Sequence, residues 1–244
     1  MISILLIGIG RYSELIPGLI NSFNGKISRN EIQFLVFTNQ KKIITKKVDI
    51  GNVEYFYFKD SGWPLNTLLR FEMFNSVRNK LEASEKVYFM NANLRVIDDD
   101  FIDKLKNANF LFLKHPGFSG LRFWLSKPYD KNPLSSCFVD FFRRIFSDYI
   151  QGCFYGGDSR LFIKINETLL INFYNDWSAG YVSRVHDESY LNHYRIYLMD
   201  DKYEILSSLY AFPEGWFSLF KPKCISIDKS KFFGEGWFSN FKDT

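Results

Sequence analysis

The sequence predicts an α/β fold, with a Rossmann-like, mixed but mostly parallel sheet flanked by helices. In the first third of its 244 residues, short apolar runs of β character alternate with helical patterns, a rhythm typical of parallel sheets. Two of these runs end in small or amide residues, at 7–10 and at 91–93. Ligands of such sheets bind at the carboxyl ends of the strands, so both positions are candidates for a site.

The first elements follow from the apolar pattern. Residues 1–9 are expected to form a buried strand, and residues 13–24 a weakly amphipathic helix with Pro17 near its start. Further strands are expected at 33–38, 53–58 and 86–90. Between the last two, a helix should begin at a cap formed by Asn66 and Thr67. Its apolar face recurs at helical spacing, through Leu68, Phe71, Phe74, Val77 and Leu81.

The second half is less regular. A strand is expected at 109–114, and an amphipathic helix at 160–172. Residues 118–136 are loop-rich, 138–146 are strongly apolar and aromatic, and 152–157 are punctuated by glycine. From Ser226 the tail is short and basic, with Lys229, Lys231 and Lys242. We expect no internal repeat and no interdomain linker, so residues 1–244 should form one domain.

Composition excludes several classes. The net charge of +4 is too small to indicate a nucleic-acid partner. Three cysteines, an odd number without paired spacing, argue against a disulfide framework or a zinc site and favour a reducing, cytoplasmic location. The apolar start is too short for a transmembrane segment. Aromatic residues reach 19%; most should be core, and some could form a stacking surface for a base or a sugar.

The run Tyr88–Leu94 reads as a buried strand that ends in two amides one residue apart, Asn91 and Asn93. Many sugar-nucleotide enzymes have an Asp-X-Asp at such a strand end, where the carboxylates hold a divalent cation that neutralises a diphosphate. A neutral amide is a poor ligand for a hard cation. A diphosphate site here would therefore work without that metal.

A second motif is His186–Asn192, in which Asp187 and Glu188 follow a histidine at the start of a helical pattern. Acidic residues in a first helical turn can be plain capping and dipole partners. Beside a diphosphate site, one of them could instead act as a nucleophile, or stabilise an oxocarbenium-like transition state.

With three further segments, these motifs resemble glycosyltransferase family 6, which includes the histo-blood group A and B transferases and α-1,3-galactosyltransferase. The five segments occur in the family's order and span most of the chain: Gly62–Phe71, Asn91–Asn93, His115–Phe118, His186–Asn192 and Pro213–Trp216. The Asn-X-Asn and the missing membrane anchor resemble the bacterial branch, in which the metal site is lost.

The resemblance implies a single GT-A domain that transfers Gal or GalNAc from UDP, with retention of configuration, to the 3-hydroxyl of a β-galactoside, often fucosylated. Partners would be UDP-Gal or UDP-GalNAc and an oligosaccharide acceptor; no cofactor or divalent metal is expected. Residues 1–93 would mainly bind UDP and residues 94–225 the acceptor, with the catalytic group. The basic tail, 226–244, would close over the donor.

The resemblance also assigns residues to roles. Glu188 matches the proposed nucleophile or cation stabiliser, and Asp187 a residue that hydrogen-bonds the donor sugar. His115 and Val185 fall on the acceptor side. Donor-binding positions match Ile7, Gly8, Ile9, Tyr12, Arg70, Asn91, Ala92, Asn93, Gln151, Gly152 and Cys153, with Lys229 and Lys231 as candidates to offset the diphosphate charge.

Plainer roles stay open for several of these residues. His115 could be a turn residue, Arg70 a surface arginine, Tyr12 a core residue and Asn91 the cap of a turn. The tail could be a frayed terminus.

Two positions depart from the family. Val185 stands where vertebrate relatives carry Trp, so acceptor preference is expected to differ. Gln151-Gly152-Cys153 matches the donor-specificity segment, and the sulfur of Cys153 should crowd a 2-acetamido group. That favours Gal over GalNAc by about 1–3 kcal/mol at most. The alternatives to a transferase are an inactive carbohydrate-binding homologue and a UDP-sugar hydrolase.

Overall fold

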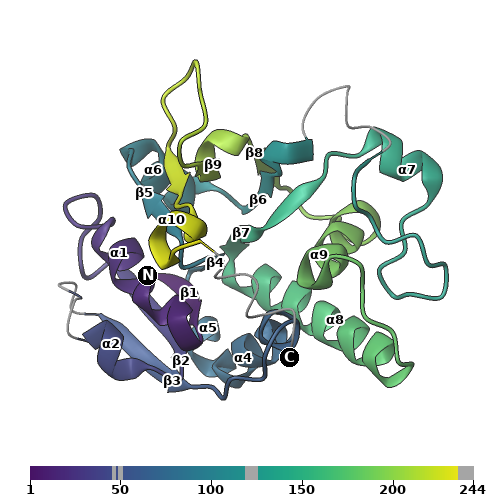
Figure 1. The fold of residues 1–244 in the computed structure, drawn as a ribbon, viewed down its shortest axis with the longest axis horizontal. Helices are drawn as coiled ribbons and strands as arrows, with labels where there is room; N and C mark the ends of the chain where they lie inside the picture. Colours follow the sequence, from purple (N-terminus) through teal and green to yellow (C-terminus); the bar gives the residue numbers. More distant parts are fainter. Residues whose placement is uncertain (46–47, 49–51, 119–125, 236–244) are drawn as a thin grey trace.

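The computed structural model describes residues 1–45, 48, 52–118 and 126–235. These residues form a seven-stranded sheet in the order β3-β2-β1-β4-β7-β6-β8 and a smaller sheet in the order β5-β10-β9 (Figure 1). The strands of the large sheet are β1 (Ile2–Gly8), β2 (Ile32–Thr38), β3 (Val53–Tyr57), β4 (Lys86–Met90), β6 (Phe110–Lys114), β7 (Ile150–Asp158) and β8 (Glu204–Leu206). Those of the small sheet are β5 (Leu94–Val96), β9 (Phe212–Pro213) and β10 (Cys224–Ser226).

The large sheet is mixed and mostly parallel, as predicted. Strands β3, β2, β1 and β4 run parallel, and so do β6 and β8. Only β7 runs against its neighbours β4 and β6 within this sheet. Two glycines permit this insertion: a Cβ on Gly156 would lie 2.1 Å from the carbonyl oxygen of Val87 in β4, and a Cβ on Gly157 would lie 2.1 Å from that of Asn109, just before β6. The arrangement is consistent with a single GT-A-like domain.

Helices cover both faces of this sheet. They are α1 (Ile16–Asn21), α2 (Lys41–Thr45), α3 (Leu65–Leu68), α4 (Arg70–Ser76), α5 (Arg78–Glu82), α6 (Asp99–Asn107), α7 (Phe141–Phe146), α8 (Ser159–Ser178), α9 (His186–Tyr197) and α10 (Lys229–Phe233), with 3-10 turns η1 (Gly10–Glu14), η2 (Pro116–Phe118) and η4 (Ser208–Ala211). One core joins α1, α6 and α10 to the face of Ile4 and Tyr88. The other joins α4, α5, α8 and α9 to the face of Leu5 and Phe89.

The predicted helix over 66–81 is broken into α3, α4 and α5. Its apolar spacing is real, since the five predicted positions are buried. The predicted cap is wrong: Asn66 lies inside α3, and its side chain accepts from the N–H of Ser61 and donates to Asp60. These bonds hold the preceding loop rather than the helix. The helix predicted at 160–172 is confirmed and extends over Ser159–Ser178.

The C-terminal segment is folded up to residue 235 at least, which contradicts a frayed terminus over that range. Strand β10 pairs with β5, and Asp228 caps α10 by accepting from the N–H of Ser230. Lys242, with the rest of 236–244, lies outside the described residues. Within the described chain, none of the helices has the length and apolarity needed to cross a bilayer.

Candidate active site

A cleft of about 720 Å³ opens at the edge of the large sheet where β1 and β4 end and the antiparallel β7 begins. This is the edge that the sequence predicted. Eleven of the predicted site residues line it: Ile7, Ile9, Tyr12, Arg70, Asn91, Gln151, Gly152, Cys153, Asp187, Glu188 and Lys229. The segments that supply them are far apart in the chain and meet only through the sheet topology.

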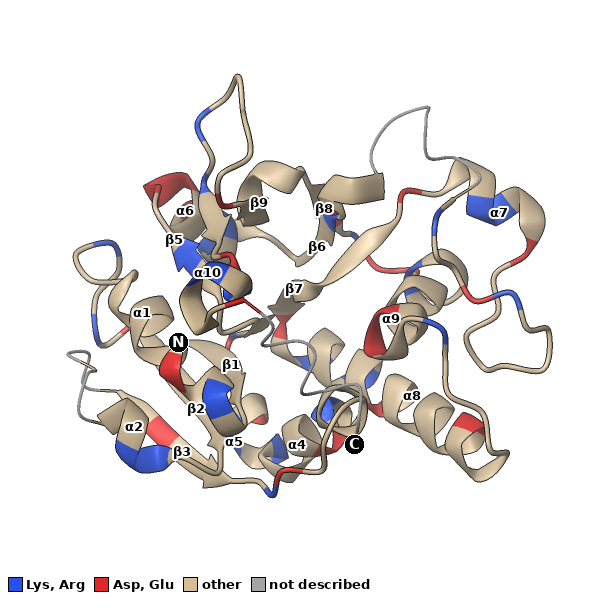
Figure 2. Cartoon of the chain, viewed as in Figure 1, with Lys and Arg blue, Asp and Glu red and all other residues tan. Residues whose placement is uncertain are grey.

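The two acids stand in the first turn of α9, which appears red at the start of this helix in Figure 2. The partial positive charge of a helix N-terminus favours carboxylates there. His186 precedes them with φ of 48°, in the left-handed region, and its carbonyl accepts from the Ser183 hydroxyl (2.8 Å). This turn sets the direction in which the helix enters the cleft.

The backbone of Gly152 connects Glu188 to Arg70, and Arg70 is in turn paired with Asp187. Its N–H donates to Glu188 Oε2 (2.6 Å), and its carbonyl accepts from Arg70 Nη1 (2.9 Å). The same Nη1 lies 2.6 Å from Asp187 Oδ2, in an ion pair whose two side chains are less than 10% exposed. A Cβ at position 152 would fall 2.7 Å from Asp187 Oδ2, so glycine is what allows β7 to approach α9 this closely.

Burial alters the titration of both acids. It raises the pKa of Asp187 to about 6, against the opposing effect of Arg70. It raises the pKa of Glu188 to about 7, although the bond from the Gly152 N–H favours the carboxylate. A carboxylate that titrates near neutrality while it faces a cleft is a common mark of a catalytic group.

Arg70 is held from two sides. Besides the ion pair with Asp187, its guanidinium lies 4.3 Å above the ring of Phe89, at the end of β4. Arg70 is 6% exposed, so it is not a surface helix arginine. Because the Asp187 carboxylate lies next to the Arg70 guanidinium, Arg70 adds less positive potential to the cleft than an unpaired cation would.

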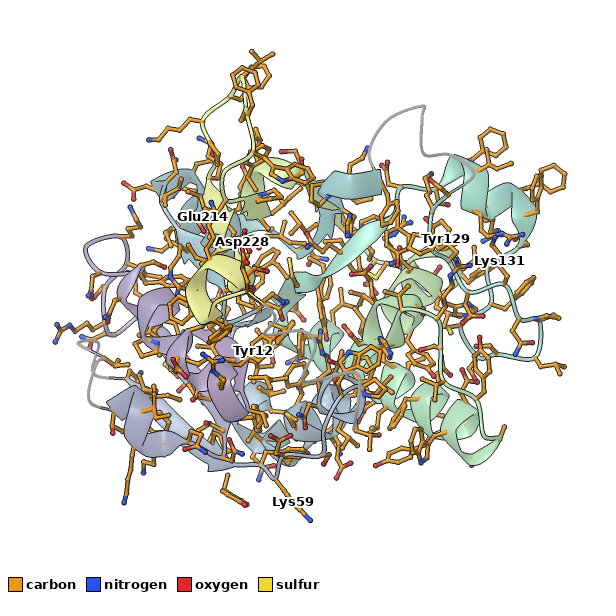
Figure 3. All side chains as sticks on the ribbon, viewed as in Figure 1. Tyr12, Lys59, Tyr129, Lys131, Glu214 and Asp228 are labelled. Atoms are coloured by element: carbon orange, nitrogen blue, oxygen red, sulfur yellow. The ribbon has the colours of Figure 1, made fainter. Side chains whose placement is uncertain are left out.

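The opposite end of the cleft is built from η1 and α10. The Lys229 ammonium donates to the Tyr12 hydroxyl (3.3 Å) and lies 5.3 Å from the centre of the Tyr12 ring. The Arg11 guanidinium lies over the ring of Phe233 (4.7 Å). Burial lowers the pKa of Lys229, as expected of an ammonium that has lost water. Tyr12 is labelled in Figure 3, between β1 and α10.

The two amides have separate surroundings. Asn91 lines the cleft. Asn93 is 5% exposed, and its Nδ2 donates to Ser226 Oγ (2.9 Å) and to the carbonyl of Ile227 (3.1 Å). Its own carbonyl accepts from the N–H of Ile227 (2.8 Å). Asn93 thus ties the C-terminal segment to the end of β4 and is not among the residues that line the cleft. The pair does not fit a hard cation, since only one neutral amide faces the site.

Five other predicted residues are also not among those that line the cleft: Gly8, Ala92, His115, Val185 and Lys231. Gly8 and Ala92 are buried beside it. The Lys231 ammonium instead points to Gly215, in the loop between β9 and β10. Val185 directly precedes α9, and its N–H donates to Ser189 Oγ (3.0 Å).

His115 lies behind Tyr149, with ring centres 5.9 Å apart. The Tyr149 hydroxyl in turn faces Glu188, without a hydrogen bond of normal geometry. Burial lowers the pKa of His115 to about 4, so the ring is neutral near pH 7. Its Nδ1 accepts from the N–H of Gly117 (3.0 Å), which leaves the proton on Nε2.

Comparison with known proteins adds a relative. Over 199 residues the chain is 31% identical to the O-antigen biosynthesis glycosyltransferase WbnI of Escherichia coli, and the match covers 82% of each protein. The chain belongs to this glycosyltransferase family. No protein-family model matches the sequence.

The glycosyltransferase cleft has further lining residues that the sequence analysis did not assign to the site: Gly10, Arg11, Asp60, Trp63, Asn66, Thr67 and Phe89. Three of them, Trp63, Asn66 and Thr67, lie in the Gly62–Phe71 segment, which was available as a signal. The Trp63 ring packs edge-on against His186 (4.7 Å). Asp60 accepts from the N–H of Gly62 and from Asn66, a role that requires the folded loop to be seen.

Proposed function

We propose that this glycosyltransferase moves galactose from UDP-galactose to the 3-hydroxyl of a β-galactoside, often fucosylated, with retention of configuration and without a divalent metal. The observation that carries the proposal is the arrangement around Gly152, whose backbone N–H binds Glu188 and whose carbonyl binds Arg70, the ion-pair partner of Asp187. It places a carboxylate of raised pKa against a cleft at the strand ends where nucleotides bind in such folds.

The donor would lie along the cleft with its uracil and ribose near Ile7, Ile9 and Tyr12. The diphosphate then meets Lys229, Arg11 and the amide of Asn91, all at the cleft wall. Burial already disfavours the charge of Lys229, and an adjacent diphosphate would restore it. A cationic wall of this kind supports transfer without a metal, since it stabilises negative charge on the leaving phosphate.

The acid end would hold the hexose. Asp187, fixed by Arg70, accepts hydrogen bonds from sugar hydroxyls. Glu188 lies beneath the anomeric carbon, where its carboxylate forms a glycosyl-enzyme or shields the cationic centre as UDP departs. UDP is a good leaving group, so the site needs positioning more than a strong acid. The acceptor approaches from the side of Trp63, His186 and the Tyr149–His115 pair, and Val185 beside them would shape its preference.

The choice of galactose rests on Cys153. Cys153 comes directly after Gly152 in β7, and it lines the cleft although it is only 6% exposed. A 2-acetamido group would have to share this space with the sulfur. Discrimination against GalNAc is expected to be modest, about 1–3 kcal/mol.

A donor and acceptor matrix in EDTA tests the proposal. Radiolabelled UDP-Gal and UDP-GalNAc are each incubated with the enzyme, with and without 2′-fucosyllactose. We expect an α-linked galactosyl product at an undiminished rate in EDTA. An absolute Mn²⁺ requirement would contradict metal independence. Free hexose in the absence of acceptor would indicate a hydrolase, and binding without turnover an inactive carbohydrate-binding homologue.

A further inference from the structure

The loop between β9 and β10 exposes an unusual set of apolar side chains. Within five residues, Trp216 is 59% exposed, Phe217 86%, Leu219 84% and Phe220 71%. Single exposed apolar residues are normal in soluble proteins, whereas a contiguous group marks an interaction site. Rings stand at the tip of this loop in Figure 3, far from the cleft lined by Tyr12. We call residues 214–223 the aromatic loop.

The base of the aromatic loop is held firmly. The Glu214 N–H donates to the carbonyl of Ser226 (2.9 Å), and the Lys223 N–H to that of Leu209 (2.8 Å). The Glu214 carboxylate accepts from the N–H of Asp228 (2.9 Å), and both residues are labelled next to each other in Figure 3. At the tip, Ser218 Oγ donates to the carbonyl of Phe220 (2.6 Å). The rings are therefore presented by an ordered loop.

The sequence of this loop occurs twice. Residues 214–221 read EGWFSLFK, and residues 235–242 read EGWFSNFK. The two octapeptides differ at one position, Leu219 against Asn240. This repeat corrects the expectation that the chain has none. The exposed apolar sequence of the loop is therefore repeated almost unchanged within the same chain, although the second octapeptide, from residue 236 on, lies outside the described residues.

Basic residues accompany the exposed rings. Lys221 follows the tip with a side chain 73% exposed, and Lys223 stands at the base; both contact Asp98 at 3.3 Å. Helix α7 carries a second group of exposed aromatic residues, Phe141, Phe142 and Phe146, with Arg143 and Arg144 between them in the sequence. In the view of Figure 1 the aromatic loop projects at the top of the molecule, and α7 lies at its upper right.

We propose that the aromatic loop is a membrane-surface anchor that inserts its rings into the headgroup region of an anionic phospholipid bilayer, with α7 as a second contact. Trp and Phe next to Lys or Arg have the chemistry of that boundary, where rings enter the apolar side and cations meet phosphates. A projecting tip also fits a penetrable surface better than the flat, wide patch expected of a stable protein interface.

Vesicle co-sedimentation of the full chain tests the anchor. Vesicles contain either phosphatidylcholine alone or equal parts of phosphatidylcholine and phosphatidylglycerol. We expect binding to the anionic vesicles, and a drop of about tenfold or more in the variant Phe217→Ser/Leu219→Ser/Phe220→Ser. The matched control is Tyr57→Ser/Ile171→Ser, which removes exposed apolar groups elsewhere (79% and 60% exposed) and should bind like the wild type.

Two further readouts distinguish a membrane anchor from a misfolded variant and from a contact between copies of the chain. Transfer to a soluble acceptor should be unchanged in the loop variant, which shows that it is folded. Wild type that ignores both kinds of vesicle, or a loop variant that binds equally well, would overturn the anchor. So would a wild type that dimerises in sedimentation analysis through this loop, since the rings would then be covered by a second copy. None of these results bears on the chemistry at Glu188.

Discussion

The two ends of the cleft differ in how their charged side chains are held. At the acid end, the backbone of Gly152 binds both Glu188 and Arg70, and Arg70 is paired with Asp187. Burial there raises the pKa of both acids. At the other end, the Lys229 ammonium donates to the Tyr12 hydroxyl (3.3 Å) and lies 5.3 Å from the centre of the Tyr12 ring. The first end joins buried charged groups to one another, whereas the second pairs a buried ammonium with the ring and hydroxyl of a tyrosine. This difference is why we propose the chemistry for the first end and the binding of the donor phosphates for the second.

The largest expected effect is at the acid end. Glu188→Gln keeps the bond from the Gly152 N–H but removes the carboxylate, so transfer should fall by about 10³-fold or more. Steady-state kinetics with UDP-Gal should show this loss in kcat, with KM for the donor nearly unchanged. Transfer close to wild type would refute the role of Glu188.

The buried ion pair should give the largest effect on stability. Arg70→Met leaves Asp187 without its partner, and the free energy of unfolding should fall by about 3–5 kcal/mol. Urea denaturation measures it. The double variant Arg70→Met/Asp187→Asn should recover part of the loss, since no buried charge is then left alone. Equal stability of Arg70→Met and wild type would mean that the acid end is not preorganised by this pair.

The binding end should respond more mildly. Lys229→Met keeps the length of the side chain and removes its charge, so the donor KM should rise by about tenfold. Lys231→Met is the matched control, because that ammonium points to Gly215 and not into the cleft. Both variants are measured at two salt concentrations. If Lys231→Met proved equally impaired, the diphosphate would lie nearer to the loop of β9–β10 than we propose.

The smallest expected effects are those of pH on kcat/KM and on the free energy of unfolding. Because Glu188 must be ionised to act, kcat/KM should decline as pH falls below about 7. The sign for stability is opposite: a carboxyl whose pKa is raised in the folded state stabilises the fold at low pH, and this contribution is lost as pH rises through about 7. Glu188→Gln should therefore exceed the wild type in unfolding free energy by about 1–2 kcal/mol at pH 8, and match it near pH 4.5.

Many of the strands and helices could be predicted from the sequence. Apolar runs located β1, β2, β4 and β6, because buried strands are continuous in apolarity. The aromatic and β-branched residues of β3 located this edge strand too, although none of its residues is buried. The two acids and the strand ends were likewise found from local pattern. Helix α6 was not predicted, although Asp98 accepts from the N–H of Asp100 as its cap. The breaks between α3, α4 and α5 leave no mark in the apolar spacing.

Contacts between distant segments were beyond the sequence. The Gly152 peptide acts through backbone groups, which carry no residue-specific signal. Asn93 looked equivalent to Asn91, yet its amide serves the C-terminal segment 133 residues away from it. The Lys231 side chain points to Gly215 because of where α10 lies, and the C-terminal segment sets the position of that helix. Such roles follow from topology, which local propensity does not encode.

The amide of Asn93 has a consequence for attempts to give this enzyme a cation. Placing aspartates at 91 and 93 would be the obvious design. At 93, however, a carboxylate would face the Ile227 carbonyl, which now receives an N–H, and two acceptors would repel each other. The hydrogen bonds from Asn93 to Ser226 and Ile227, which hold β10 and the segment after it, would be weakened before any Mn²⁺ was bound. A metal-binding variant would therefore first need a replacement for these hydrogen bonds.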